Sequence, residues 1–244
     1  MRVKLLSAFP LKAVIFDCDG VLVDTEPLHY RAFQRVLAPL GLGHTYEHYL
    51  ARYIGFDDRD AFLEAFREAN RPIDDAILMQ LMRAKEQALQ AMIGNGISSF
   101  PGVIPLVRGL VARGIPLAVA SGALRQEVDA FIGGLGLTGV FSVIVAADDV
   151  KKSKPDPETY LRALDQLHKN GVLGVLEVGS CIAIEDTPAG IQAAKGAGVH
   201  VIAVTNSFSA DQLDAADQIV ESLEELSVEG LVRLIGRDMH DGEP

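Results

Sequence analysis

The sequence predicts an α/β fold: a doubly wound parallel sheet with an α-helical domain inserted after the first strand. Short apolar runs recur along the 244-residue chain, with helical patterns between them. Continuous apolar runs without strict alternation are typical of parallel strands that are covered on both faces. Strands that alternate with helices imply right-handed crossovers and a doubly wound sheet. One long interval, 26–97, breaks this rhythm because it has helical patterns and no convincing strand.

The strand–helix elements can be placed in order along the chain. The first apolar run, Ala13-Val14-Ile15-Phe16, predicts a strand over 12–17. Similar runs predict strands over 116–121, 142–148, 181–185 and 200–205, and a weaker run predicts one over 218–220. Apolar residues at helical spacing predict helices over 103–113, 124–133, 157–169 and 189–196.

The interval 26–97 predicts a separate helical domain. It holds helical patterns over 28–40, 45–53, 59–69 and 74–92, and Gly94-Asn95-Gly96 and Pro101-Gly102 mark the return to strands. We therefore expect an α/β core made of 1–25 and 98–244 and a helical cap made of 26–97. An insert after the first strand lies at the carboxyl ends of the strands, where open α/β sheets bind ligands. Its two connections are expected to act as a hinge.

Composition limits the kind of partner. The net charge of −11 argues against nucleic acid, which binds a basic face, and against an anionic membrane surface. The 18 uncharged residues 130–147 have the length of a marginal membrane span, but their four glycines predict a helix end, a turn and a buried strand instead. Cys18 and Cys181 are too few for a disulfide framework. We expect a cytoplasmic protein that is a monomer or a weak homodimer.

Polar side chains that could take part in catalysis or bind a metal stand at the ends of four predicted strands. They are Asp17 and Asp19 after the first strand, Ser121 after the second, Lys154 in the loop after the third, and Glu185 and Asp186 after the fourth. In a parallel sheet these ends meet at one edge, and carboxylates clustered there are expensive to bury unpaired. Mg²⁺ would relieve their repulsion, because it is commonly held by a few carboxylates, waters and a phosphate.

This pattern assigns a task to each group at the sheet edge. Asp17, Asp186 and Glu185 are the side chains expected to hold Mg²⁺. Ser121 and neighbouring backbone N–H groups, such as that of Gly122, can donate hydrogen bonds to a phosphate. Lys154 supplies a compact positive charge. The sequence therefore predicts a site for a divalent cation and a small phosphorylated metabolite.

The constellation resembles the haloacid dehalogenase superfamily at all four of its motifs. The matching residues are Asp17-Cys18-Asp19-Gly20-Val21, Ser121, Lys154 and Glu185-Asp186. The stretches "FDCDGVLVDTEPLH", "SKPDPETY" and "IEDTPAGIQAAKGAG" are similar to the subfamily with a helical cap inserted after the first motif. That group includes β-phosphoglucomutase and phosphoglycolate-type phosphatases. The resemblance extends over the whole chain and implies a Rossmann-like core.

The resemblance also implies residue roles. Asp17 would attack phosphorus and become a transient aspartyl phosphate. Asp19 would protonate the leaving oxygen and then activate water, and its backbone carbonyl would bind Mg²⁺. Dehalogenases of the superfamily lack this second aspartate, so Asp19 favours phosphoryl transfer. Gly20 gives the backbone room to turn beside the substrate. Thr25 and His29, at the hinge, would couple cap closure to the site.

The cap bears on the choice between hydrolysis and isomerisation. In β-phosphoglucomutase-like members a cap arginine and a cap lysine grip a second phosphate, and Lys85 matches the lysine. Asp57-Asp58 intrude where the arginine is expected, so Arg59 is the shifted candidate. Hydrolysis of a small sugar or organic phosphate monoester is therefore favoured, and a sugar phosphomutase is the alternative. A receiver-like phosphorylatable switch is a third reading, but such domains are about half this length and lack the insert.

Overall fold

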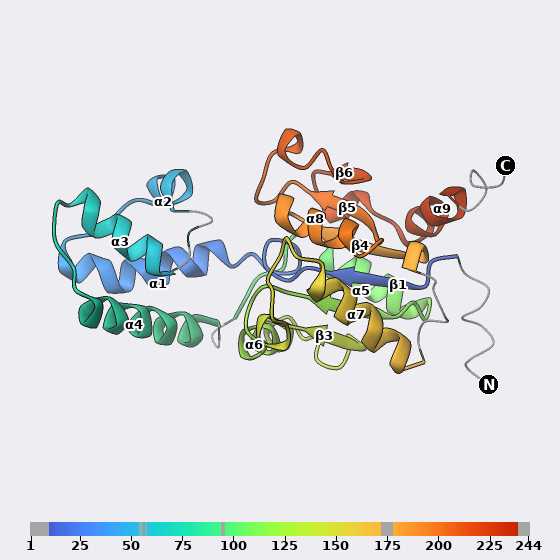
Figure 1. Ribbon diagram of the computed structural model, residues 1–244, viewed down its shortest axis with the longest axis horizontal. Helices are drawn as coiled ribbons and strands as arrows, with labels where there is room; N and C mark the ends of the chain where they lie inside the picture. Colours follow the sequence, from blue (N-terminus) through green and yellow to red (C-terminus); the bar gives the residue numbers. More distant parts are fainter. Residues whose placement is uncertain (1–9, 54–55, 57, 94–95, 172–177, 239–244) are drawn as a thin grey trace. The chain divides into compact units, whose positions relative to one another are not determined.

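The computed structural model describes residues 10–53, 56, 58–93, 96–171 and 178–238. Contacts between residues divide the chain into two units. One unit joins Met1–Asp24 to Ser98–Pro244, and the other is Thr25–Ile97. Asp57 and the Gly94-Asn95 part of the expected turn lie outside the described residues. The secondary structure of both units is drawn in Figure 1.

The first unit is built on a six-stranded sheet whose strand order is β3-β2-β1-β4-β5-β6. Its strands are β1 (Ala13–Phe16), β2 (Leu117–Ala120), β3 (Val143–Val145), β4 (Cys181–Glu185), β5 (His200–Val204) and β6 (Gln218–Val220). All the pairings are parallel, and Ile15 of β1 is in register with Ala118 of β2 and Ala183 of β4. The strand order reverses between β1 and β4, the position at which sheets of this kind open a ligand crevice.

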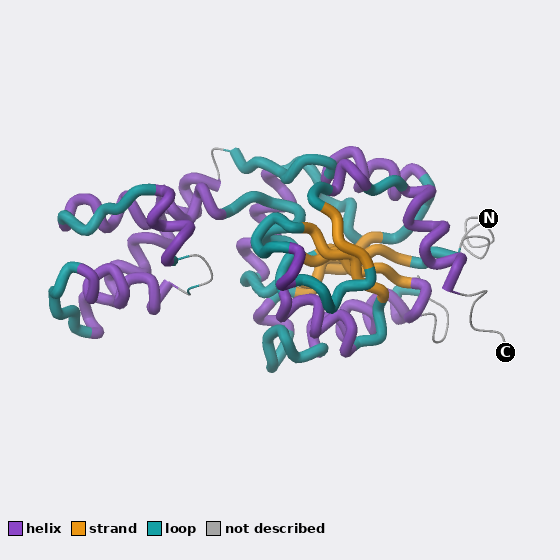
Figure 2. The backbone as a smooth tube through the Cα atoms, turned by 90° about the horizontal axis from the view of Figure 1, so that it is seen from above, coloured by secondary structure: helices purple, strands orange, loops and turns teal. Residues whose placement is uncertain are grey.

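Helices cover the sheet, which Figure 2 shows enclosed among them. They are α5 (Val103–Ala112), α6 (Arg125–Gly134), α7 (Glu158–Lys169), α8 (Pro188–Gly196) and α9 (Val228–Asp238). Tyr160 and Leu167 of α7 and Ile191 of α8 pack in one buried cluster with Ile15 and Val201 of the sheet. Every residue of β1 and β4 is buried, which explains why these strands are apolar without alternation. The predicted doubly wound α/β class is confirmed.

Two elements differ from the sequence expectation. The third strand ends at Val145, because Asp149 accepts a hydrogen bond from Ala146 N and turns the chain into the 3₁₀ segment Ala147–Asp149. Helix α9 was not predicted, although its buried Val228, Leu231 and Ile235 follow helical spacing. The stretch 130–147 is the end of α6, a turn and β3, as expected, and no described helix is long and apolar enough to cross a membrane.

The described part of the second unit contains helices joined by loops and no strand. Its helices are α1 (Glu26–Leu37), α2 (Tyr46–Arg52), α3 (Asp58–Glu68) and α4 (Asp75–Ile93). Pro27 lies in the first turn of α1, where its missing N–H costs nothing. Thr45 caps α2 by accepting a hydrogen bond from His48 N at 3.2 Å. The core of this unit contains Phe33, Tyr49, Phe62 and Leu78 among other apolar side chains.

Candidate active site

The carboxyl ends of β1 and β4 bring three carboxylates together. Asp17 follows β1, Glu185 ends β4 and Asp186 follows it. One ligand oxygen from each lies within 4.8 Å of the others, and all three side chains are buried. The convergence arises because adjacent parallel strands end at the same edge of the sheet. The grouping predicted from sequence for these three residues is present in the structure.

Lys154 joins this cluster from the loop that precedes α7. Its Nζ donates to Asp17 Oδ1 and to Glu185 Oε1, each at 2.6 Å. Burial lowers the pKa of Lys154, but the charges of Asp17 and Glu185 outweigh burial and hold that pKa above its ordinary value. Lys154 therefore remains a cation and compensates part of the negative charge.

One lysine does not balance three carboxylates. Burial raises the pKa of Asp17 to about 7, against the opposing attraction of Lys154. Burial also holds the pKa of Asp186 well above its usual range, and the charges of Asp17 and Glu185 act in the same direction. The protein alone thus disfavours full ionisation of the cluster. A divalent cation would reverse this preference.

The oxygen atoms of the cluster show where such a cation fits. Glu185 Oε1 accepts from Lys154 and from Tyr160 OH, and Glu185 Oε2 accepts from Asp186 N and Thr187 Oγ1. Asp186 Oδ1, by contrast, is buried and has no hydrogen-bond partner among the described residues. A buried carboxylate oxygen left open is costly in an apolar setting. The donor set of Asp17, Asp186 and Glu185 fits Mg²⁺, with Asp186 Oδ1 as the open ligand atom.

The first loop forms a tight turn beside Asp186. Cys18 O accepts hydrogen bonds from Leu22 N and Val23 N, and Gly20 N donates to Val23 O. Gly20 has φ +80°, and a Cβ placed on it would lie 1.8 Å from Asp186 Oδ2. Only glycine satisfies both the positive φ and this close approach. The half-buried Asp19 precedes Gly20 in the same turn.

Ser121 lies at the end of β2, the strand beside β1. Its side chain is buried, and its Oγ accepts a hydrogen bond from Ala123 N at 3.0 Å. Because the oxygen is acting as an acceptor there, the hydroxyl hydrogen is available for another group. Gly122 is exposed, and a Cβ built on it would meet no atom within 4 Å. This open position suits backbone contact with a phosphate.

The helical unit contains the other predicted residues. Lys85 is buried, and its Nζ lies 2.6 Å from Asp58 Oδ1 and 2.9 Å from His29 Nδ1. Burial, together with the charge of Lys85, lowers the pKa of His29 to about 3, so His29 is neutral. Arg59 instead forms an exposed pair with Asp75 at 3.2 Å. The structure therefore brings His29 and Lys85 together and leaves Arg59 apart from them.

Thr25 stands at the start of this helical unit. It is buried at the N-terminus of α1, and its side chain makes no capping hydrogen bond to that helix. Its backbone carbonyl accepts hydrogen bonds from Leu28 N and His29 N. Thr25 is the first residue of the helical unit and follows Asp24, the last residue of the first segment of the other unit.

Three polar side chains at the sheet edge were missed from the sequence. Tyr160, on the first turn of α7, donates its OH to Glu185 Oε1 at 2.7 Å, and its ring lies 5.1 Å from Lys154 Nζ. Asn206 and Ser207 follow β5 and contact the first and fourth strand ends. A signal existed for Asn206 and Ser207, because the β5 end carries polar groups just as the other strand ends do.

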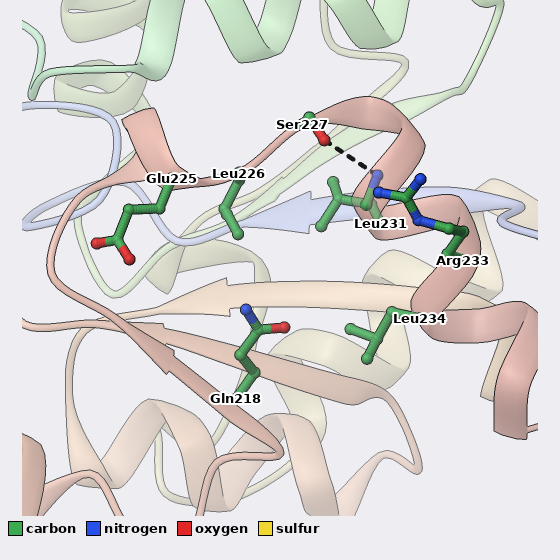
Figure 3. Close-up of a pocket in the computed structure, with 8 residues that line it drawn as sticks. Gln218, Glu225, Leu226, Ser227, Leu231, Arg233 and Leu234 are labelled. Atoms are coloured by element: carbon green, nitrogen blue, oxygen red, sulfur yellow. Dashed lines mark hydrogen bonds between the residues drawn. The ribbon is translucent and has the colours of Figure 1, made fainter.

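A separate pocket of about 380 Å³ lies between β6 and α9. Figure 3 shows Gln218 and Arg233 among its lining residues, with Ser227 accepting a hydrogen bond from the backbone of Gly230. None of the residues predicted for catalysis or metal binding lines this pocket. The carboxylate cluster lies instead at the carboxyl ends of β1 and β4.

Comparisons with known proteins agree with this geometry. The sequence profile of the haloacid dehalogenase-like hydrolases matches residues 14–204. Protein CbbY of Rhodobacter capsulatus is 34% identical over 233 residues, which span 92% of this chain and 99% of that protein. The phosphorylated carbohydrates phosphatase of Thermotoga maritima is 33% identical over 192 residues, 79% of this chain and 84% of that protein.

A solved structure shows the same fold. CbbY from Rhodobacter sphaeroides, crystallised in complex with xylulose-(1,5)bisphosphate, superposes with a TM-score of 0.74 at 29% identity. The match covers 91% of this chain and 99% of the CbbY chain. The likeness therefore includes nearly the whole length of both proteins.

Proposed function

Because this chain belongs to the haloacid dehalogenase-like hydrolase family, we propose that it is a Mg²⁺-dependent phosphatase of a small sugar or organic phosphate monoester. The observation that carries the proposal is the buried cluster of Asp17, Glu185 and Asp186, bridged by Lys154 and with Asp186 Oδ1 left open. The phosphorylated carbohydrates phosphatase among its relatives supports the substrate class. The two buried free cysteines, Cys18 and Cys181, suit a reducing cytoplasm.

In the proposed reaction Asp17 is the nucleophile. Its Oδ1 is held by Lys154 at 2.6 Å, which fixes the direction of the carboxylate. Attack on phosphorus would form an aspartyl phosphate and release the alcohol, and water would then hydrolyse the phosphoenzyme. Asp19 would give a proton to the leaving oxygen and later take one from that water, a contribution of ~10²–10⁴ in rate. Ser121 would donate its hydroxyl hydrogen to a phosphate oxygen.

The metal-binding groups in the proposal are the side chains of Asp17, Glu185 and Asp186 and the backbone carbonyl of Asp19. When bound, Mg²⁺ would neutralise phosphate charge and lower the cost of bringing an anion to an acidic edge. Lys154 would keep the unligated oxygens of Asp17 and Glu185 oriented. The acidic protein can thereby accept an anionic substrate.

We further propose that the domain over 26–97 is a cap that selects the substrate for the core over 1–25 and 98–244, with Thr25 at its hinge. The two candidate cations of this cap are already paired, Lys85 with Asp58 and Arg59 with Asp75. A second phosphate would have to displace these carboxylates. This pairing favours a monophosphate and simple hydrolysis over a phosphomutase, which must hold a second phosphate while the sugar turns.

The decisive experiment is a panel of phosphate esters assayed for phosphate release with Mg²⁺, with a chelator and with Asp17→Asn. The panel contains sugar monophosphates, β-glucose 1-phosphate and xylulose 1,5-bisphosphate. We expect monophosphate hydrolysis that is lost in both treatments. Release that persists in both would contradict the mechanism.

Two other outcomes favour the alternatives. Formation of glucose 6-phosphate from β-glucose 1-phosphate without release of phosphate would establish the mutase. A long-lived phosphorylated Asp17 without turnover would instead indicate a receiver-like switch, since a phosphatase must hydrolyse its phosphoenzyme rapidly. A preference for the bisphosphate would refute the inference that the pairs Lys85–Asp58 and Arg59–Asp75 disfavour a second phosphate.

A further inference from the structure

The loop after β5 reaches two other strand ends. Ser207 Oγ donates a hydrogen bond to Asp186 Oδ2, and Asn206 Nδ2 donates to the Gly20 carbonyl at 2.7 Å. Both side chains are half-buried. The fifth strand end of the sheet therefore contacts the groups contributed by the first and the fourth.

The contact with Ser207 makes the two oxygens of Asp186 different. Oδ2 is held by the serine, whereas Oδ1 is buried without a partner among the described residues. Rotation of the carboxylate would break the Ser207 hydrogen bond, and hydrogen bonds to charged groups are stronger than those between neutral groups. Ser207 thus keeps Oδ1 in one orientation, as the open ligand atom of the cluster.

The contact with Asn206 acts on the turn that carries Asp19. Gly20 has φ +80°, and a Cβ there would lie 1.8 Å from Asp186 Oδ2 and 2.9 Å from Ser207 Oγ. The glycine backbone, Asp186 and Ser207 are therefore packed together. By holding the Gly20 carbonyl, Asn206 fixes this turn against Asp186, and with it the neighbouring Asp19 backbone.

We infer that Asn206 and Ser207 are positioning residues for the divalent cation: Ser207 orients Asp186, and Asn206 holds the Asp19–Gly20 turn. The inference rests on the proposed Mg²⁺ site and adds to it the loop after β5. Partners of this kind, behind the metal ligands, typically account for about 10–100-fold in metal affinity or activity. The two residues would act through Asp186 and Gly20 and would not touch the substrate.

The test measures cation binding directly, without substrate. Mg²⁺ affinity is determined by titration calorimetry, and Mn²⁺ affinity by paramagnetic resonance, for the wild type, Ser207→Ala, Ser207→Thr and Asn206→Ala. We expect Kd to rise about 10–100-fold in Ser207→Ala and in Asn206→Ala. Ser207→Thr keeps a hydroxyl and should retain most of the wild-type affinity.

Ser209→Ala is the matched control. Ser209 lies on the same loop, but it is exposed and its Oγ bonds to Gln212 Oε1 at 2.9 Å instead of to the cluster. The cation affinity of the Ser209→Ala variant should equal that of the wild type. In activity assays, Ser207→Ala should need more Mg²⁺ for half-activation yet recover most of its kcat when Mg²⁺ is saturating, a split that a general loss of structure would not produce.

The outcomes separate this inference from the proposed function. Unchanged cation affinity in both Ser207→Ala and Asn206→Ala, or an equal loss in Ser209→Ala, would overturn the inference, and so would a wild type that binds neither cation. If the wild type binds Mg²⁺ and the variants weaken it, but no ester is hydrolysed, the positioning roles stand and the phosphatase proposal fails. A circular dichroism spectrum of each variant checks that its fold is retained.

Discussion

At Gly20 the backbone itself is part of the candidate site. Substitution by alanine would place a Cβ 1.8 Å from Asp186 Oδ2, on a residue whose φ is +80°. The turn or the carboxylate would have to move by more than an ångström. We expect Gly20→Ala to weaken Mg²⁺ binding at least ~10-fold, on the scale of lost ligand positioning, and to reduce phosphatase activity further. Calorimetry and steady-state kinetics measure the two effects.

Gly136→Ala separates crowding from backbone strain. Gly136 belongs to the same unit and has φ +68°, but a Cβ there meets nothing within 4 Å. This variant should lose about 1–2 kcal/mol of stability from the left-handed conformation alone and keep its Mg²⁺ affinity. If Gly20→Ala and Gly136→Ala have the same effect on Mg²⁺ binding, the close approach at Gly20 has no functional meaning.

Individual residues differ in how far the sequence can predict their contacts. Asp17, Glu185 and Asp186 could be grouped because parallel strands end at one edge, whatever the details of packing. Tyr160 could not be added, because its hydrogen bond to Glu185 depends on how α7 is rotated over the sheet. Asn206 and Ser207 depend on the path of a loop, which no periodic pattern encodes. The sequence therefore predicted which strand ends carry the clustered polar groups. It predicted less well which neighbouring side chains hydrogen-bond to those groups.

Lys85 links three helices of the second unit. It extends from α4, pairs with Asp58 at the start of α3, and contacts His29 Nδ1 and the ring of Phe33 on α1. The Lys85 side chain is 2% exposed, whereas that of Asp58 is 32% exposed. Loss of the ion pair should therefore cost more free energy when the buried Lys85 is left unpaired than when the partly solvated Asp58 is.

This asymmetry predicts unequal effects for the two halves of the pair. Asp58→Asn leaves a buried ammonium without its anion, and we expect a loss of about 1–3 kcal/mol, below the ~3–5 kcal/mol of a fully buried pair because Asp58 is partly solvated. Lys85→Met, of similar length, should cost less. Urea unfolding of both single variants and the double variant measures the two losses of stability and the coupling energy between Lys85 and Asp58. A larger loss in Lys85→Met than in Asp58→Asn would contradict this account.

Whole elements were predicted more completely than their ends. Strands β1, β2 and β4 follow from apolar runs, since burial of all their residues leaves little choice of residue. The run that marks β6 is weaker because Gln218 is exposed. The third strand was predicted too long, because Asp149 and Arg125 form a local network at its end. Helix α9 was overlooked although its apolar spacing was present, because no strand follows it to mark a crossover unit. Tertiary hydrogen bonds therefore explain the early end of β3. The end of the strand–helix alternation explains why α9 was missed.

For the whole molecule, the negative charge at the site is what must be compensated before an anion can bind. A protein with net charge −11 is proposed to bind an anion at an edge that carries three buried carboxylates. Lys154 compensates part of this charge locally, and a divalent cation would compensate the rest. Because the same carboxylates bind protons and the metal, both the free energy of unfolding and the Mg²⁺ affinity should depend on pH.

The metal-free protein should lose stability as pH rises. The pKa of Asp17 is about 7 in the folded protein, against 3.8 for an ordinary aspartate. Between these values the unfolded chain holds fewer protons than the folded one, so the free energy of unfolding falls as pH rises through this window. Above about pH 7, Asp17 is ionised in both states and adds no further loss. The raised pKa of Asp186 acts in the same direction.

Mg²⁺ should reverse this loss, because it binds the deprotonated carboxylates. At about a hundredfold excess over its Kd a ligand adds ~2.7 kcal/mol, or roughly 5–10 °C in Tm for a chain of this size. We expect this gain at about pH 8 and a much smaller one at about pH 5.5, where protons compete for Asp17 and Asp186. Scanning calorimetry with and without Mg²⁺, with sodium chloride at equal ionic strength as the control, measures the difference. Asp17→Asn should reduce the pH dependence to the share that Asp186 contributes and lose most of the Mg²⁺ effect. An equal Tm gain at both pH values in the wild type would show that the cation binds elsewhere.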